Sequence, residues 1–391
     1  MSTSRLDCAR PGMPGHGINA SKPSAMKVES EHGDVAGLFT EIAGIVGEYG
    51  GHLHPGLIIR NSGQSYCAAI TPQGLAAAPE QPLIAIPRSL LIPVDGIGWQ
   101  VRDGRLQAVS GLSDLSGPQR LLLERMLSLY NLAGKVEEAC RTLPALALQG
   151  QEGLLELLRR GRRHWAGTPA PPAEAFIGTR TLAYSQYRSP PVGATARPVK
   201  VLMPLIDVLN HHPGGAPFAA SVEGVSVAVR AKGEDLECFG SYGFRDALSL
   251  LLNYGFASTQ PQFVQSIACE VDLAGWGRLG IQRQDFIPPR DLPRIDRTHD
   301  GVSISHLNLP ADRSRHAPDR LALALRMLRP GATGEAVEAA AREAGAQVRA
   351  LNRAYYQQLS AAVDAASGAG AQVLDMLRIV IDHQLQALQP A

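Results

Sequence analysis

The chain has 391 residues, long enough for more than one domain, because single hydrophobic cores stop growing at roughly 250 to 300 residues. Its apolar content of 45% and charged content of 19% are those of a globular protein, and a formal net charge of +1 excludes a strong electrostatic attraction to nucleic acid or acidic membranes. The five cysteines include no C-x-x-C pair, which argues against a disulfide framework or a zinc site and favours a reducing, cytoplasmic setting.

The amino-terminal residues 1–33 are rich in Pro, Gly and Ser and lack a continuous apolar segment. We expect a disordered tail that is neither a signal peptide nor a membrane span. Asp34 then stands where it can cap a helix. Apolar residues at helical spacing follow as far as the Gly50-Gly51 pair, namely Leu38, Ile42, Ile45 and Tyr49.

From residue 57 to 93 the pattern predicts short strands, "GLIIR", "SYCAAIT" and "PLIAIP", separated by turn residues. Helical spacing returns in "PQRLLLERMLSLYNLAG" and "EGLLELLRRGRRHW", which we interpret as a helical insert over about 101–175.

A hairpin is expected around Glu223-Gly224, where valines alternate on both sides, and "RDALSLLLNYGF" predicts a short helix that ends on Gly255. A mixed, Pro-rich segment extends from 259 to about 317. Thr333 can cap a long helix to about 365, and apolar residues on one face predict another helix over 371–389.

The stretch most suggestive of chemistry is "VLMPLIDVLNHHPGG", residues 201–215, where an apolar run ends in Asn210, His211 and His212. One interpretation is a metal site formed with Asp207, although no third cluster completes the ligand shell. Another is a buried segment that turns into a loop, with Asp and Asn bonded to their own backbone. A nucleophilic cysteine is not indicated, because Cys238 has no basic neighbour.

A second segment, "YGFRDALSLLLNYGF" (242–256), changes this interpretation. Together with "DVLNH" (207–211) it resembles the SET-domain protein methyltransferases, in particular the class of the Rubisco large-subunit lysine methyltransferase. In that family a D-x-x-N-H segment and a Y-G segment followed by a helix and Y-G-F come together in one pocket. "HPGLIIR", "IAIPRSLLI" and "AFIGTRTL" look like its upstream segments, and the resemblance covers about 34–391.

The resemblance implies an α+β fold: a SET-type scaffold of short β-sheets with a helical insert over 34–258, and a mostly α-helical substrate-binding domain over 259–391. It implies methyl transfer from S-adenosyl-L-methionine to a lysine, or a histidine, of a non-histone protein substrate, with neither nucleic acid nor a membrane as partner. The geometry that aligns acceptor and methyl group should dominate such chemistry.

By resemblance, Tyr242 is the catalytic residue whose hydroxyl lies at the point of methyl transfer. Asn210, His211, Asp207 and Arg180 would belong to the cofactor pocket, with Arg180 neutralising the cofactor carboxylate and Asp207 serving as a hydrogen-bond partner at the turn. The acceptor channel would have Tyr254 and Phe256 as walls, and no metal is implied. His212 lies outside the motif.

Two departures from the family pattern concern the cofactor. Where a Gly-x-Gly segment is usual, this chain has "NSGQSYC", so that Tyr66 would stack on the cofactor or block it. Ala247 replaces an asparagine usually found five residues after the catalytic tyrosine. These departures leave open a second interpretation, a catalytically inactive SET-fold module that binds proteins.

Overall fold

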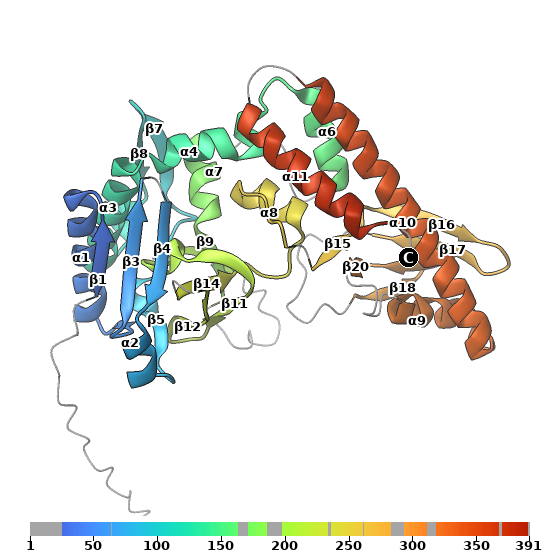
Figure 1. The fold of residues 1–391 in the computed structure, drawn as a ribbon, viewed down its shortest axis with the longest axis horizontal. Coiled ribbons are helices and arrows are strands. Elements are labelled where there is room, and N and C mark those ends of the chain that lie inside the picture. The colour runs from blue at the N-terminus through green and yellow to red at the C-terminus, as the bar shows by residue number, and fades with distance from the viewer. Residues whose placement is uncertain are drawn as a thin grey trace, which may run out of the picture.

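The computed structural model describes residues 26–63, 65–162, 171–185, 198–233, 236–260, 262–282, 293–310, 318–366 and 370–389, and it shows a mixed α+β protein (Figure 1). The predicted α+β class is therefore confirmed. Within these ranges no helix is long and apolar enough to cross a membrane. Residues 1–25 of the predicted tail lie outside the described residues.

Nine strands of the described chain form the main sheet, in the order β1-β3-β4-β14-β11-β12-β5-β2, with β13 paired to β14. They are β1 (Lys27–Ser30), β2 (His52–Leu53), β3 (Leu57–Ser62), β4 (Ser65–Ile70), β5 (Pro82–Pro87), β11 (Asn210–Ala220), β12 (Gly224–Ala228), β13 (Ala231–Lys232) and β14 (Glu237–Ser241). Strand β1, which the sequence analysis included in the tail, pairs in parallel with β3. The three predicted strands and the hairpin at Glu223-Gly224 are confirmed as β3, β4, β5 and the β11–β12 pair.

Helix α1 (Gly33–Glu48) is confirmed, and the predicted residues Ile42 and Ile45 are buried, together with Phe39 and Val46. Of the other two predicted residues, Leu38 is half-buried and Tyr49 is exposed. The start of α1 differs in detail from the prediction. His32 occupies the N-cap position without a side-chain hydrogen bond, and Asp34 lies inside the first turn. There a carboxylate stabilises the helix through the helix dipole and not as a cap.

The middle of the chain adds a hairpin, a small sheet and five helices (Figure 1). The hairpin is β7 (Gly98–Arg102) and β8 (Arg105–Ser110), and the small sheet has the order β6 (Ile92–Pro93), β10 (Val199–Leu202), β9 (Thr181–Tyr184). The helices are α3 (Gly117–Leu132), α4 (Lys135–Thr142), α5 (Pro144–Ala147), α6 (Glu152–Gly161) and α7 (Pro172–Thr179); α2 (Pro72–Ala77) follows β4.

A second hydrophobic core joins helices from the middle and from the carboxyl-terminal part of the chain. It contains α6, α8 (Ala247–Tyr254), α9 (Pro318–Leu328), α10 (Gly334–Ala365) and α11 (Ala371–Ala387). Thr333 caps α10 through a bond from the Ala336 N–H, as predicted. The Pro-rich segment from 259 to about 317, for which we expect mixed structure, contains short strands. They are β15 (Phe263–Gln265), β16 (Cys269–Leu273), β17 (Gly277–Ile281), β18 (Ile295–Arg297), β19 (Gly301–Ile304) and β20 (Asn308–Pro310).

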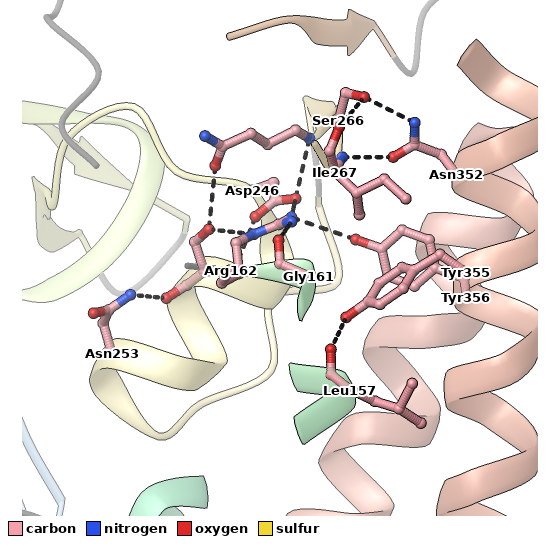
Figure 2. Close-up of polar contacts among 12 residues, drawn as sticks. Leu157, Gly161, Arg162, Asp246, Asn253, Ser266, Ile267, Asn352, Tyr355 and Tyr356 are labelled. Carbon is pink, nitrogen blue, oxygen red and sulfur yellow. Dashed lines mark hydrogen bonds and ion pairs between the residues drawn. The ribbon is translucent and has the colours of Figure 1, made fainter. Parts of the chain in front are cut away.

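A buried ion pair fixes the start of α8 to this second core (Figure 2). Arg162, at the end of α6, pairs with Asp246, and both side chains are fully buried. Asp246 also caps α8 through the Ser249 N–H at 2.9 Å, while the Arg162 guanidinium reaches the Tyr356 hydroxyl of α10 at 3.4 Å. Because a buried pair is tolerated only when its remaining hydrogen-bonding groups are satisfied, these contacts hold α6, α8 and α10 in one arrangement.

Candidate functional site

A cavity of about 1180 Å³ is bounded by α7, β9, the start of β11, the 241–245 turn and α8. Ligand pockets in proteins typically enclose about 300 to 1,000 Å³, so this cavity has room for more than one small group. Of the residues singled out from the sequence, five line it: Arg180, Asp207, His211, Tyr242 and Tyr254.

Strand pairing brings the two motifs together. Strands β11 and β14 run in parallel, with His211 opposite Gly240, so that the D-x-x-N-H segment lies beside the Y-G segment. The register then shifts between His211 and Ala216. A Cβ atom on Gly215 would lie 2.7 Å from the Gly240 backbone. The glycine that follows the two histidines therefore permits the close approach of the strands.

Tyr242 is held by hydrogen bonds at its side-chain hydroxyl and at its main chain. Its hydroxyl donates to the Leu209 carbonyl at 2.6 Å, and its main-chain N–H donates to Nδ1 of His211 at 3.1 Å. Its own carbonyl accepts a bond from Nε of Arg245 at 3.2 Å. Burial raises the pKa of the Tyr242 phenol to about 12, so the hydroxyl keeps its proton at neutral pH.

The imidazole of His211 is a neutral acceptor. Burial, followed by the charge of His212, lowers its pKa to about 4. Since Nδ1 accepts the Tyr242 N–H, the ring proton must reside on Nε2. The ring also lies 5.1 Å from the Tyr242 ring, centroid to centroid.

Aromatic rings surround Tyr242. Ring centroids of Tyr254, Phe218 and Phe256 lie 4.8, 6.1 and 6.3 Å from the Tyr242 centroid. Tyr254 and Phe218 line the cavity, whereas Phe256 does not. The ring centroids of Phe256 and His211 lie 6.0 Å apart. Helix α8 delivers Tyr254, and Gly255 ends that helix with φ 75°, a conformation that favours glycine.

Arg180 and Asp207 also line the cavity and contact each other. One guanidinium nitrogen of Arg180 donates to the main-chain carbonyl of Asp207 at 2.9 Å, and the Asp207 carboxylate accepts from the Tyr130 hydroxyl at 2.5 Å. Burial raises the pKa of Asp207. Nε of Arg180 is buried and has no hydrogen-bond partner among the described residues.

Asn210 and Tyr66 are placed apart from the cavity. The Asn210 amide donates to the Tyr66 carbonyl at 3.3 Å and to the Glu237 carboxylate at 2.8 Å, which ties β11 to β4 and β14. The Tyr66 ring packs edge-on against Phe39 at 5.2 Å, with the Lys135 ammonium 4.7 Å from its centroid. Neither side chain lines the cavity, so the Tyr66 side chain belongs to the core of the sheet.

His212 accepts the Gly214 N–H at 2.9 Å and lies 5.4 Å from the Phe239 ring. In the described part of the chain, no group of three or more His, Cys, Asp or Glu side chains is arranged to hold a metal ion. Cys238 is fully buried, and burial raises the pKa of its thiol to about 12, which makes it unreactive as a nucleophile.

Two cavity residues that contact Tyr242, namely Phe218 and Arg245, were not predicted as site residues. Phe218 gives no local signal, because an aromatic residue in a strand is most often part of a core. Arg245 stands inside the quoted "YGFRD" segment, three residues after Tyr242, and its guanidinium lies 5.5 Å from the Tyr254 ring. The position of Arg245 close to Tyr242 in the sequence is the signal from which it could have been predicted as a site residue.

Comparison with known proteins identifies a solved structure and no sequence relative. No family model matches the chain, and no curated protein matches it. The structure is similar to the crystal structure of the SET domain of LSMT bound to lysine and AdoHcy, with 12% sequence identity and a TM-score of 0.37 over 90% of this chain and 89% of that chain.

Proposed function

We propose that this protein is a SET-domain methyltransferase that uses S-adenosyl-L-methionine to methylate a lysine or histidine side chain of another protein. One observation carries the proposal: the Tyr242 hydroxyl is fixed on the Leu209 carbonyl inside a ring-lined cavity. The two motifs that carry the family resemblance build this wall of the cavity together.

Tyr242 acts as a hydrogen-bond acceptor in this proposal. Its only proton is directed at the Leu209 carbonyl at 2.6 Å, so the lone pairs of the phenol oxygen remain for polarised C–H groups or an acceptor N–H. With a pKa of about 12 the phenol carries no charge at neutral pH and does not serve as a general base. The residue orients the reacting groups through geometry.

The aromatic surroundings favour an uncharged acceptor. An ammonium group cannot act as a nucleophile, and partial desolvation beside Tyr242, Tyr254 and Phe218 disfavours the protonated form of a lysine. A neutral imidazole fits the same surroundings. The rings also exclude water from the point where a methyl group would be transferred.

The surroundings of Arg180 fit the cofactor. A carboxylate would pair with the Arg180 guanidinium, whose buried Nε lacks a partner among the described residues. When bound, S-adenosyl-L-methionine supplies a methyl group activated by its sulfonium. We propose that residues 34–258 provide this site, and that residues 259–391 contribute to binding the protein substrate.

A second function, a catalytically inactive protein-binding module, is favoured by one observation. Ala247 is buried at the start of α8, where the family has an asparagine, so this position offers no side-chain polar group to the cavity. Cofactor binding separates the two functions.

The decisive experiment is calorimetry with S-adenosylhomocysteine, followed by incubation of the protein with radiolabelled cofactor and cell lysate. The proposal predicts saturable binding and a labelled protein band. Absence of binding at millimolar S-adenosylhomocysteine, with the protein folded by circular dichroism, would favour the inactive module.

A further inference from the structure

The lining of the cavity includes positively charged side chains. Among the described residues some exposed arginines form salt bridges, such as Arg141 with Glu137 at 2.8 Å and Arg294 with Asp296 at 2.7 Å, and others, such as Arg326, form none. Within the described chain, the three basic residues that line the cavity form no salt bridge: Arg180, Lys200 and Arg245.

The two arginines donate to main-chain carbonyls, whereas the main chain of Lys200 bonds the Asp95 carboxylate. Arg245 donates through Nε to the Tyr242 carbonyl and places its guanidinium 5.5 Å from the Tyr254 ring, beside the proposed acceptor site. Lys200 lies in β10 opposite Ala183 and is exposed. Its main-chain N–H donates a hydrogen bond to the Asp95 carboxylate. Arg180 is already assigned to the cofactor.

Two carboxylates also line the cavity, and neither forms a salt bridge with these cations among the described residues. Asp207 is bonded to Tyr130 at the wall that Arg180 shares. Glu174, in the first turn of α7, is exposed to solvent. Arg245 places a positive charge beside the Tyr254 ring, and the charge of Arg180 acts on the Tyr242 phenol. The two arginines therefore bring positive charge to the proposed acceptor site.

We propose that the substrate presents its acceptor residue within an acidic segment, whose Asp or Glu side chains pair with Arg245 and Lys200. This inference rests on the proposed function, since it names the substrate class of the same site. Carboxylates flanking the acceptor would form hydrogen-bonded ion pairs with the terminal guanidinium nitrogens of Arg245, whose Nε already bonds the Tyr242 carbonyl. They would also pair with the exposed ammonium of Lys200. A basic segment would be repelled from both positions.

Peptide binding tests the inference without relying on catalysis. Fluorescein-labelled peptides of equal length, each with one central lysine or histidine and flanks of Glu, Gln or Arg, are titrated with the full chain and followed by anisotropy. We expect the Glu-flanked peptides to bind at least about tenfold more tightly than the Gln-flanked ones. The preference should shrink as salt rises from about 50 to 500 mM, because rim charges are screened.

Charge reversal at the rim supplies the matched control. Lys200→Glu should abolish the preference for Glu flanks and Lys200→Arg should retain it, while Arg326→Glu, an equal charge change on exposed α9 away from the cavity lining, should leave it unaltered. Equal binding of Glu- and Gln-flanked peptides, or tightest binding of Arg-flanked ones, would overturn the inference. Failure of the proposed function has a different signature: no peptide is methylated and S-adenosylhomocysteine does not bind, whatever the anisotropy shows.

Discussion

The imidazole of His211 and the backbone of Tyr242 are joined by a hydrogen bond of 3.1 Å, from the Tyr242 N–H to Nδ1 of the histidine. This bond links the ends of two adjacent parallel strands, 31 residues apart in the sequence. His211 therefore positions Tyr242 in addition to lining the cavity, and it does so only while its ring is neutral.

Replacing His211 separates this positioning role from simple packing. Asparagine can present an oxygen near the place of Nδ1, so His211→Asn should retain most activity, whereas His211→Val should lower kcat by about tenfold, the value of one lost hydrogen bond. The KM for a peptide substrate should change little. Equal losses in the two variants would show that the hydrogen bond has no positioning role.

The lowered pKa of His211 also predicts a pH effect on stability. In the unfolded chain the imidazole takes up a proton below its ordinary pKa of 6.5, whereas in the folded protein it does so only near pH 4. The unfolded state thus binds more protons between these values, and the free energy of unfolding should fall as pH decreases from 6.5 to about 4.

Allowing for partial exposure of the ring, this loss should be on the order of 2 kcal/mol. Urea unfolding of the wild type and of His211→Asn across this range measures it by difference, because other titrating groups are common to both. Parallel stability curves for the two proteins would contradict the assignment.

Tyr242→Phe removes the hydroxyl from the proposed transfer point. We expect kcat to fall by at least about 100-fold, as for the loss of one preorganised polar contact in other active sites. The unpaired Leu209 carbonyl should cost only about 1 kcal/mol of stability. Cofactor affinity should be retained, so calorimetry with S-adenosylhomocysteine is the control. Full activity in this variant would remove Tyr242 from its catalytic role.

Arg180 should govern cofactor affinity. Arg180→Met removes a charge-assisted hydrogen bond to the cofactor carboxylate and should weaken S-adenosylhomocysteine binding by about 10- to 100-fold. Arg180→Lys should lose less, because it keeps the charge. Isothermal titration calorimetry measures the change, and Arg326→Met on the exposed face of α9 should bind normally. Unaltered affinity in Arg180→Met would place the carboxylate elsewhere.

Breaking the buried Arg162–Asp246 pair should be costly. Arg162→Met leaves the carboxylate buried without its partner and should lower the free energy of unfolding by about 3 to 5 kcal/mol. Adding Asp246→Asn removes the isolated charge and should restore part of this loss. Denaturant unfolding provides the measurement.

The matched control for that pair is Arg378→Met, which breaks an exposed pair with Asp375 and should cost no more than about 1 kcal/mol. If the buried and exposed variants lose equal stability, the buried pair does not hold the helices together.

Local patterns predicted elements whose partners are close in the sequence. Helix α1 and the β3–β4 hairpin follow from periodicity and turn residues within one short stretch, and Thr333 caps α10 by bonding a backbone group three residues ahead. The cavity wall around Tyr242 could be predicted because each of its two motifs lies within one short segment of the sequence.

Other features depend on contacts that no local pattern contains. Strand β15 pairs with β20 more than 40 residues later, which is why the segment beyond 259 was read only as mixed. Leu205 adopts φ 64°, a conformation uncommon for leucine and imposed by its buried surroundings ahead of the Ile206–Val208 turn. The location of Tyr66 in the core follows from Phe39 and Lys135 around its ring.

The two sides of the cavity have separate supports. Tyr242 is held by the main sheet, through its hydrogen bonds to Leu209 and His211. Tyr254 belongs to α8, whose leucines pack with α10 and α11 in the second core. Heating that softens the second core first will displace Tyr254 while the sheet remains folded. Enzymatic function should then disappear at a lower temperature than the strand signal in circular dichroism, and the helical end of the chain sets the temperature limit of catalysis.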